Sequence, residues 1–254
     1  FEVSTQTYPR KQDWLVVNAL AGLCGSLHKL AFDLRLLQSP PIGEWSEPFG
    51  EKQVGSSAMP FKRNPIVAEN VDSLARQVAA LPRVMWDNAA LSLLERTLDD
   101  SANRRVSVPD AYLSMDGVLV LVENVARGLA VNPMVIRRNL EEHLPFLATE
   151  TVMMLATQRG GDRQDLHERI RRHSMDAARL MKEEGARADL LDRIAGDPAF
   201  GMSREELLDL VNPRDFVGRA PEQVDRFLSE WVNPVLDRYS DPSIQAIGDP
   251  DVRV

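Results

Sequence analysis

The chain has 254 residues, of which 44% are hydrophobic and 6% aromatic, and its formal net charge is −8. An acidic chain of this kind does not suit binding to bulk nucleic acid or to a membrane surface. Its single cysteine, Cys24, excludes a disulfide framework and a cysteine-rich metal site, and favours a reducing, cytoplasmic location. We see no apolar run approaching the roughly 20 residues of a membrane span. The first residue is Phe1, and we expect the sequence to be one part of a longer protein.

The first predicted element is a long helix from about Lys11 to Gln38. Apolar residues recur along it at alternating spacings of three and four, which is a heptad pattern; they are Val16, Leu20, Leu23, Leu27, Leu30, Leu34 and Leu37. At ~1.5 Å per residue the helix would be roughly 40 Å long. Helices of this length belong to bundles, often bundles shared between subunits.

The stretch from Ser39 to Pro65 contains five prolines and three glycines. Irregular segments longer than ~12–15 residues are uncommon in compact domains and tend to be functional. Asn64 and Pro65 predict the start of a second helix, with Asn64 as N-cap and Pro65 at the first helical position. We expect Pro82 to kink or end that helix.

A polar interruption at 95–105 separates this helix from another long apolar helix over 108–131. Asn132 and Pro133 predict the start of the next helix, and we place a domain boundary there. The remaining helices are shorter, and no convincing strand is apparent. The predicted class is all-α, with a long-helix bundle in 1–131 and a smaller helical domain in 132–254.

The segment GSSAMPFKRNP, from Gly55 to Pro65, carries hydroxyl and basic groups in a loop. One interpretation is a plain surface loop, with its serines as turn residues and its cations solvated. The other is catalytic. A hydroxyl of Ser56 or Ser57 would act as a base if loop amides and the Lys62 ammonium favoured its ionised form. The same donors would hold a substrate carboxylate that gains charge in the transition state.

A second candidate is the segment ERTLDDSANRR, from Glu95 to Arg105. It is either a solvated loop in which Ser101 caps the following helix, or an anion clamp. As a clamp, Arg96, Arg104 and Arg105 would grip a phosphate through paired N–H donors, and Ser101 would add a hydroxyl. Two basic loops in an acidic protein favour a small polyanionic ligand.

The four histidines have no metal-ligand spacing, so we predict no metal site; they are His28, His143, His167 and His173. Gly160 and Gly161 before Asp162 predict a helix C-cap followed by an N-cap. The Gly-Ser-Ser loop has neither the spacing nor the preceding strand of a nucleotide-binding P-loop.

The loop GSSAMPFKRNP resembles the signature loop of the fumarase/aspartase superfamily. Within it the chain resembles the adenylosuccinate lyase family. The matching segments span nearly the whole chain; they are QTYPRK (6–11), ERTLDDSANRR (95–105), HLPFLATE (143–150), GGDRQDLHE (160–168) and FVGRAPEQV (216–224). The resemblance implies a cofactor-free, homotetrameric helical enzyme that eliminates fumarate from a succinylated purine nucleotide, with active sites shared between subunits. The substrates would be adenylosuccinate, giving AMP, and SAICAR, giving AICAR.

The resemblance also implies roles for individual residues. Ser56 would be the general base that removes the β-proton of the succinyl group. Lys62 would stabilise the carbanionic intermediate, and Ser57 and Asn64 would bind the succinyl carboxylates with it. The nucleotide phosphate and ribose would be held by Arg96, Ser101 and Arg105. The family's general-acid histidine corresponds to a region before Phe1, so we expect this chain alone to be inactive.

Two alternatives stay open. One is another lyase of the superfamily, acting on argininosuccinate or on a carboxymuconate that cyclises. The other is a non-catalytic helical scaffold.

Overall fold

The computed structural model describes residues 1–50, 59 and 61–240. Helices make up most of the described chain, and its only sheet is a ribbon of two short strands. The all-α prediction is therefore confirmed. The described chain divides into two compact units between Pro133 and Met134, close to the predicted boundary. Whether each unit is a domain in its own right stays a prediction.

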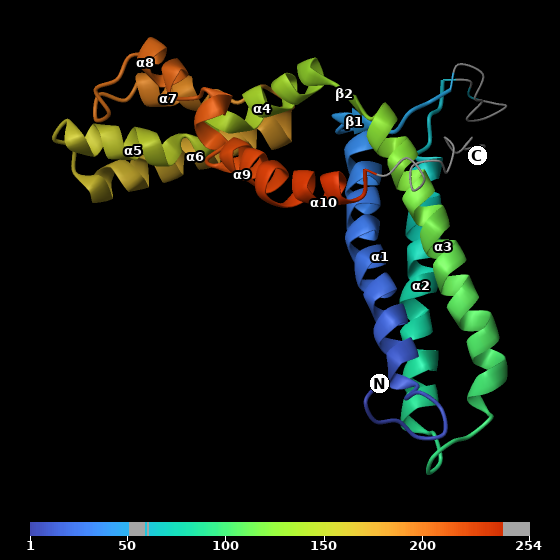
Figure 1. Cartoon of the computed structure of the whole chain (residues 1–254). Helices are drawn as coiled ribbons and strands as arrows, with labels where there is room; N and C mark the ends of the chain where they lie inside the picture. Colours follow the sequence, from blue (N-terminus) through green and yellow to red (C-terminus); the bar gives the residue numbers. More distant parts are fainter. Residues whose placement is uncertain (51–58, 60, 241–254) are drawn as a thin grey trace. The chain divides into compact units, whose positions relative to one another are not determined.

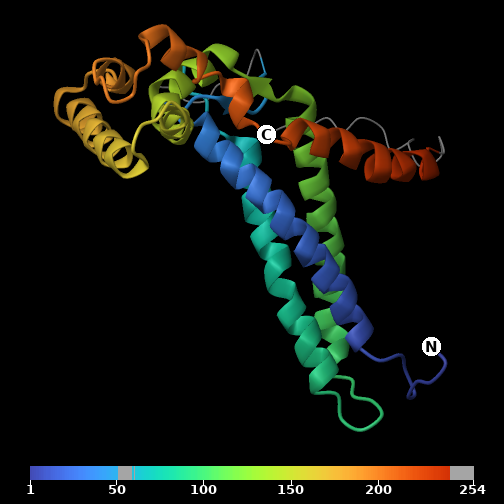
Figure 2. The ribbon, with the colours of Figure 1, turned by 90° about the vertical axis from the view of Figure 1, so that its left-hand side faces the viewer.

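The first unit is a bundle of three long helices. These are α1 (Lys11–Gln38), α2 (Ile66–Ala90) and α3 (Asp100–Gly128). Helix α1 packs along α2, α2 packs along α3, and successive helices run in opposite directions (Figures 1 and 2). The bundle consequently has two ends. One holds the end of α1 and the start of α2, and the other holds the start of α1, the end of α2 and the start of α3.

The predicted heptad face of α1 is only partly the buried one. Leu34 is buried, but Leu23 and Leu30 are 45% and 44% exposed, whereas Cys24 and Ala31 are buried. Small side chains at these two positions let α1 approach its neighbours closely, and the larger leucines flank the contact. The heptad spacing was found correctly, but the face was assigned about one residue out of phase.

Helix α1 is also long and apolar enough, by length and composition alone, to cross a membrane. It is the one helix of the described residues with this property, so the expectation that no apolar segment approaches the length of a membrane span was wrong. Core helices of soluble proteins meet the same criterion, so this property does not distinguish a membrane-spanning helix from a core helix.

Both later helices of the bundle differ from their predicted bounds. Helix α2 continues through Pro82 to Ala90, since the flanking Leu81 and Met85 pack into the core and compensate for the missing hydrogen bond. Helix α3 begins at Asp100, so the second half of the predicted polar interruption is helical.

The short ribbon is an antiparallel pair of strands, β1 (Trp45–Ser46) and β2 (Ala130–Val131), with Trp45 opposite Val131. No strand was predicted, because two-residue strands carry no periodicity. The ribbon ties the irregular segment after α1 to the residues that follow α3.

The second unit consists of shorter helices, which are α4 (Pro133–Leu147), α5 (Thr149–Gln158), α6 (Arg163–Glu184), α7 (Leu190–Ala195), α8 (Arg204–Asp209), α9 (Ala220–Phe227) and α10 (Asn233–Arg238). A 3-10 turn, Pro213–Phe216, precedes α9, and a π-helical turn, Leu228–Val232, joins α9 to α10. The core of this unit lies among α5, α6, α7 and α8, with Phe200 at its centre.

The predicted punctuation between α5 and α6 is confirmed. Gly160 has a positive φ of 101°, and the Asp162 carboxylate accepts hydrogen bonds from the first amides of α6. Asp197, after α7, is bound by the His173 ring at 3.0 Å and by Arg169 at 3.1 Å. Burial alone would raise the pKa of Asp197, but these hydrogen bonds and one from the Ala199 amide outweigh it, and the pKa is lowered.

Candidate active site

Part of the signature loop lies at the start of α2. Ser56 and Ser57, predicted as base and substrate ligand, fall outside the described residues. Lys62 lies within them: its backbone N–H donates to the carbonyl of Met59 at 3.0 Å, and its side chain is exposed. Among the described residues the Lys62 ammonium has no ion-pair partner, so it is available to an anion.

Asn64 does not cap α2 as predicted. The helix begins at Ile66, the residue at the N-cap position is Pro65, and Pro65 provides no side-chain hydrogen bond. The Asn64 carbonyl accepts from the Ile66 amide at 2.9 Å, while its side-chain amide bonds to none of the described residues. Of the two roles assigned to Asn64, the capping role was wrong and the ligand role stays a prediction.

Glu47 takes over the capping role. Its carboxylate accepts hydrogen bonds from the amides of Val67 at 3.1 Å and Ala68 at 2.9 Å, and the residue is only 3% exposed. Burial raises the pKa of Glu47, against the opposing effect of these two amide bonds. The sequence analysis missed Glu47, because a cap reached from 20 residues away leaves no local signal.

Gln38, the last residue of α1, fixes the same region. Its side chain accepts from the Glu47 amide at 2.9 Å and donates to the Arg63 carbonyl at 3.3 Å. The backbone that carries Lys62 and Asn64 is therefore tied to α1 as well as to α2.

The predicted phosphate-binding residues lie at the other end of the bundle. Arg96 is exposed in the loop between α2 and α3, and Ser101 and Arg105 lie on successive turns of α3. The Arg105 guanidinium donates to the Ser101 carbonyl at 3.1 Å and to the Ser101 hydroxyl. These two side chains form one patch of donors on α3.

Arg104, the third arginine of the motif, is engaged internally. Its guanidinium donates to the Tyr8 hydroxyl and to Asp13 at 3.4 Å, and it lies 3.6 Å from the Asp100 carboxylate. Hence the hypothesis that three arginines grip one anion is wrong for Arg104, which faces away from Arg105 because adjacent helical residues point about 100° apart.

A cleft of about 220 Å³ lies between the N-terminal segment and the loop before α3. Residues 7–11 line one side, Glu95 and Arg96 line the other, and Asp100 lies between them. Leu94 on the rim has φ 49°, a left-handed conformation that strains a leucine, and its side chain is fully exposed. The cleft joins two of the matching family segments, 6–11 and 95–105.

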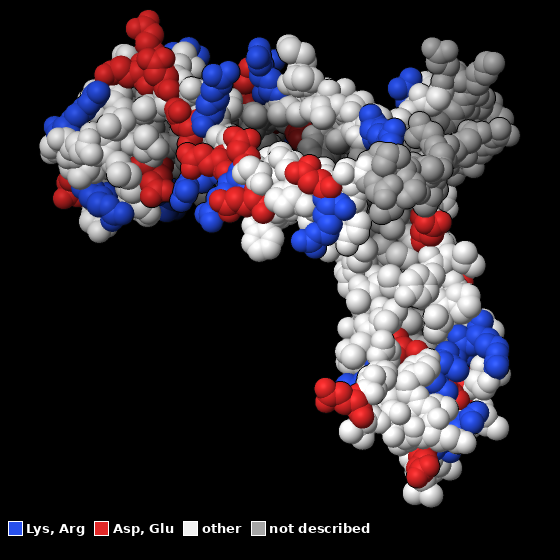
Figure 3. Space-filling model, viewed as in Figure 1, with Lys and Arg blue, Asp and Glu red and all other residues white. Residues whose placement is uncertain are grey.

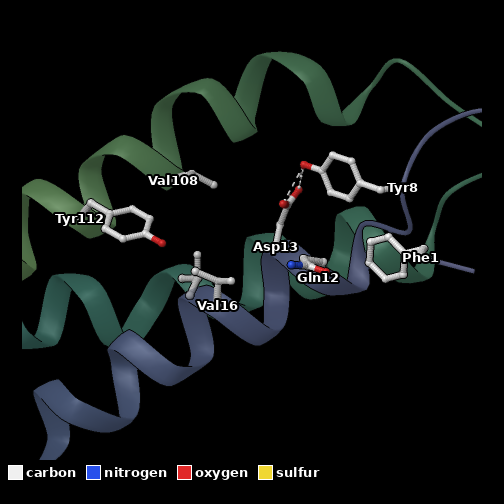
Figure 4. A pocket seen from close by; sticks show the side chains of 8 residues that line it. Phe1, Tyr8, Gln12, Asp13, Val16, Val108 and Tyr112 are labelled. Atoms are coloured by element: carbon white, nitrogen blue, oxygen red, sulfur yellow. Dashed lines mark hydrogen bonds between the residues drawn. The ribbon is translucent and has the colours of Figure 1, made fainter. Parts of the chain in front are cut away.

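A second, more apolar pocket of about 410 Å³ opens beside the cleft, between α1 and α3 (Figure 4). Val16 and Val108 line its floor, and the Tyr8 hydroxyl on its rim donates to Asp13 at 2.8 Å. Tyr8 lines both hollows, so the cleft and this pocket share one wall.

The two halves of the candidate site do not meet within one chain. Lys62 and Asn64 precede α2, and Arg96, Ser101 and Arg105 follow it (Figures 1 and 2). The 25 residues of α2, at ~1.5 Å each, separate them by roughly 37 Å. A nucleotide is much shorter than this distance.

Comparison with known proteins agrees with the resemblance. A family model described as "Adenylosuccinate lyase C-terminus" matches residues 145–227, and one described as "Lyase" matches residues 2–80. The chain is 43% identical over 240 residues to adenylosuccinate lyase of Schistosoma mansoni, and 44% identical over 239 residues to that of Saccharomyces cerevisiae. Each alignment covers 94% of this chain.

The chain belongs to the adenylosuccinate lyase family. It spans about half the length of the curated relatives that it matches, 50% and 49% for these two. Among solved structures it is similar to 3-carboxy-cis,cis-muconate lactonizing enzyme from Pseudomonas putida, with a TM-score of 0.73 and 28% identity. That match covers 85% of this chain and 47% of the other. The fold of that enzyme thus matches most of this chain.

No group of three or more His, Cys, Asp or Glu side chains in the described part of the chain is arranged to hold a metal ion. The site described above offers cations and amide or hydroxyl groups instead, which suit carboxylates and phosphates.

Proposed function

We propose that this chain is part of an adenylosuccinate lyase. The enzyme would eliminate fumarate from adenylosuccinate, giving AMP, and from SAICAR, giving AICAR. The observation that carries the proposal is the 43–44% identity, over 94% of the chain, to proteins named adenylosuccinate lyase. The exposed cations at both ends of the bundle, Lys62 at one and Arg96 and Arg105 at the other, support it, because the substrate carries carboxylates at one end and a phosphate at the other.

In the proposed reaction the Ser56 alkoxide removes the β-proton of the succinyl group. The electron pair left on carbon delocalises into the adjacent carboxylate, and the Lys62 ammonium stabilises that charge. The C–N bond then breaks, fumarate leaves, and the released nitrogen, the 6-amino group of AMP or the carboxamide of AICAR, takes up a proton. Ser57 and Asn64 hold the succinyl carboxylates. No cofactor or metal takes part.

At the other end of the substrate, Arg96, Ser101 and Arg105 bind the phosphate and the ribose. Arg105 and Ser101 already share a hydrogen bond, and Arg96 lines the neighbouring cleft. Charged hydrogen bonds to a phosphate are strong and directional, and arginine's paired N–H groups match its geometry.

The proposed enzyme is a homotetramer in the cytoplasm, with each site built by more than one chain. Large apolar side chains remain exposed along α1 and α3; they are Leu15, Leu23, Leu30, Phe32, Leu36, Val106, Tyr112, Leu113 and Leu119. In the face shown in Figure 3, uncharged side chains cover the middle of the bundle and charged ones gather at its lower end. Contact with other copies would cover this surface and bring a second bundle end to each cleft.

A second candidate is a lyase of the same superfamily with another substrate. The structural similarity to a muconate lactonizing enzyme favours it. A third is a helical scaffold without activity.

Turnover by the full-length protein separates these candidates. Adenylosuccinate, SAICAR, argininosuccinate and 3-carboxy-cis,cis-muconate are each supplied, and ultraviolet absorbance follows fumarate release from the first three and lactone formation from the fourth. We expect turnover of the first two, and a loss of several orders of magnitude in kcat for Ser56→Ala with an intact tetramer. Turnover of only one of the other compounds would replace the proposal, and inactivity with all four would favour the scaffold.

A further inference from the structure

Five side chains at the lower end of the bundle form one connected network, which we name the Asp100 latch. Its members are Tyr8, Arg10, Asp13, Asp100 and Arg104. The Arg10 guanidinium donates to the Asp100 carboxylate at 2.5 Å, and Arg104 lies 3.6 Å from the same oxygen. Both guanidiniums also lie near the Tyr8 ring, that of Arg10 at 4.6 Å and that of Arg104 at 5.8 Å from the ring centroid.

The latch depends on one buried charge. The Asp100 side chain is 2% exposed and that of Arg10 is 12% exposed. Burying a carboxylate is costly unless cations and hydrogen bonds compensate for it, and removing one partner leaves the other unpaired. Two guanidiniums share the Asp100 carboxylate, and the Nε of Arg104 has no hydrogen-bond partner among the residues that the structure describes. Without the Asp100 charge, Arg10 and Arg104 would repel each other at this point.

The latch also joins parts of the chain about 90 residues apart. Arg10 and Tyr8 belong to the segment that lines one side of the cleft, and Asp100 belongs to the first turn of α3. Asp100 directly precedes Ser101 and comes five residues before Arg105 in α3. Fixing Asp100 to Arg10 therefore fixes the start of α3, with its two proposed phosphate ligands, against the cleft wall.

We propose that Asp100 is a positioning residue for nucleotide binding. It contacts no substrate itself, and it holds the N-terminal segment and the start of α3 at the separation at which Arg96, Ser101 and Arg105 address one phosphate. This inference rests on the proposed function for the identity of the ligand, although the latch itself rests on contacts within the chain.

The test compares Asp100→Asn with Asp99→Asn in the full-length protein. Asn keeps the shape of Asp but removes the charge and turns an amide N–H₂ toward arginine. Asp99 is the matched control, since it is exposed and lies next in sequence, and its carboxylate accepts a hydrogen bond from Thr97 at 2.8 Å and from no other residue in the described part of the chain. We expect the Kd of AMP to rise about tenfold or more in Asp100→Asn, equivalent to ~1.4 kcal/mol, and to stay within about twofold in Asp99→Asn.

A second ligand separates positioning from general damage. The binding constant of fumarate, which occupies the succinyl end of the site, should stay within about twofold of the unmodified protein in both variants. Arg10→Gln, which removes the same ion pair from the other side, should reproduce the loss for AMP. The double variant Asp100→Asn/Arg10→Gln should be no weaker than the worse single variant, because the two residues act as one unit.

An unchanged AMP affinity in Asp100→Asn, or equal losses for AMP and fumarate, would overturn the inference. So would failure of both Asp100→Asn and Arg10→Gln to fold, because the pair would then support the fold as a whole. If the unmodified protein binds neither AMP nor succinyl nucleotide, the proposed function fails instead. Hydrogen exchange at residues 8–13, faster in Asp100→Asn but not in Asp99→Asn, would then still show the latch.

Discussion

Arg104 and Arg105 are adjacent in the sequence, but their side chains point in different directions and have different partners. Arg104 turns toward Tyr8, Asp13 and Asp100, whereas Arg105 turns back onto Ser101. The difference follows from helical geometry, since α3 already includes both residues and its rotation separates their directions. Arg105 is exposed and open to a ligand, whereas the Arg104 side chain is only 25% exposed and pairs with Asp13 and Asp100.

Because the Arg105 guanidinium is exposed, we expect nucleotide binding to weaken when the side chain is truncated. In Arg105→Ala we expect nucleotide affinity to fall by ~1.5–3 kcal/mol, the usual worth of a charged hydrogen bond, with a smaller change in kcat. Calorimetric titration with AMP measures it. Arg83→Ala is the control, because Arg83 is an exposed arginine of α2 whose guanidinium pairs with Asp87 and lies over the Trp86 ring, away from the proposed phosphate ligands in the sequence. An AMP affinity as tight in Arg105→Ala as in the control would remove Arg105 from the phosphate site.

The sequence predicted the residue types of the site better than their local structure. Arg96, Ser101 and Arg105 were singled out by the motif, and they lie at one end of the bundle; their ligand roles stay predictions. Asn64 was assigned as a cap because Asn before Pro commonly caps helices. The cap actually comes from Glu47, through a contact 20 residues distant that no local pattern encodes.

At the scale of elements, the start of α2 is held from outside the helix. Its first amides have no partner within the helix, and Glu47 accepts from two of them. Because Glu47 follows β1 and bonds to Gln38 through its own amide, the helix start, the ribbon and α1 form one support for Lys62 and Asn64.

Removing that support should destabilise the bundle. We expect Glu47→Ala to lower the free energy of unfolding by about 0.5–2 kcal/mol, as for loss of a helix cap. Urea unfolding at a fixed protein concentration measures the change. In Glu123→Ala, which removes an exposed carboxylate paired with Arg127 on α3, the change should stay within about 1 kcal/mol. Equal effects in the two variants would argue against the capping role.

In the second unit, Asp197 links α6 to the segment after α7. Its lowered pKa means that the native state binds a proton less readily than the unfolded chain. The stabilisation is therefore complete above the unfolded pKa of about 3.9 and is lost as the pH falls through the lower native value.

The lowered pKa of Asp197 predicts how the stability of the Asp197→Asn variant depends on pH. At neutral pH the variant should be less stable by about 1.5–3 kcal/mol, the worth of charged hydrogen bonds, and the difference should shrink as the pH falls below about 4. Chemical unfolding across the pH series follows it. Asp176→Asn, at an exposed carboxylate paired with Arg179, should differ little at any pH. A difference for Asp197→Asn that is independent of pH would contradict the assignment.

Periodicity and punctuation explain why the elements were predictable and their faces were not. Proline and glycine positions, together with apolar spacing, predicted the bounds of α1 and the start of α6 closely. Which face of α1 is buried depends on how closely its neighbours approach, and small residues such as Cys24 and Ala31 decide that. Leu23 and Leu30 have the correct spacing for a core but lie beside it.

At the scale of the whole molecule, the separation of the two site halves is the dominant fact. The sequence placed Lys62 and Arg105 only 43 positions apart, but a straight helix between them turns this into roughly 37 Å. A functional site that uses both residues must therefore combine the Lys62 end of one bundle with the Arg105 end of another. The exposed apolar side chains of α1 and α3 provide a surface on which bundles would pack.

Mixed assemblies test this arrangement directly. Lys62→Ala, which we expect to be nearly inactive, and Arg105→Ala, which we expect to turn over little substrate at concentrations well below its raised KM, are co-expressed with different tags as full-length proteins. Doubly tagged assemblies are purified and assayed at such a concentration. If each site takes Lys62 from one chain and Arg105 from another, random mixing leaves about a quarter of the sites with both residues intact in a symmetric oligomer. We expect about that fraction of the unmodified activity.

Arg96→Ala mixed with Arg105→Ala is the control, because both residues lie at the same end of the bundle and would come from the same chain. Mixed assemblies of Lys62→Ala and Arg105→Ala no more active than this control would mean that one chain supplies the whole site.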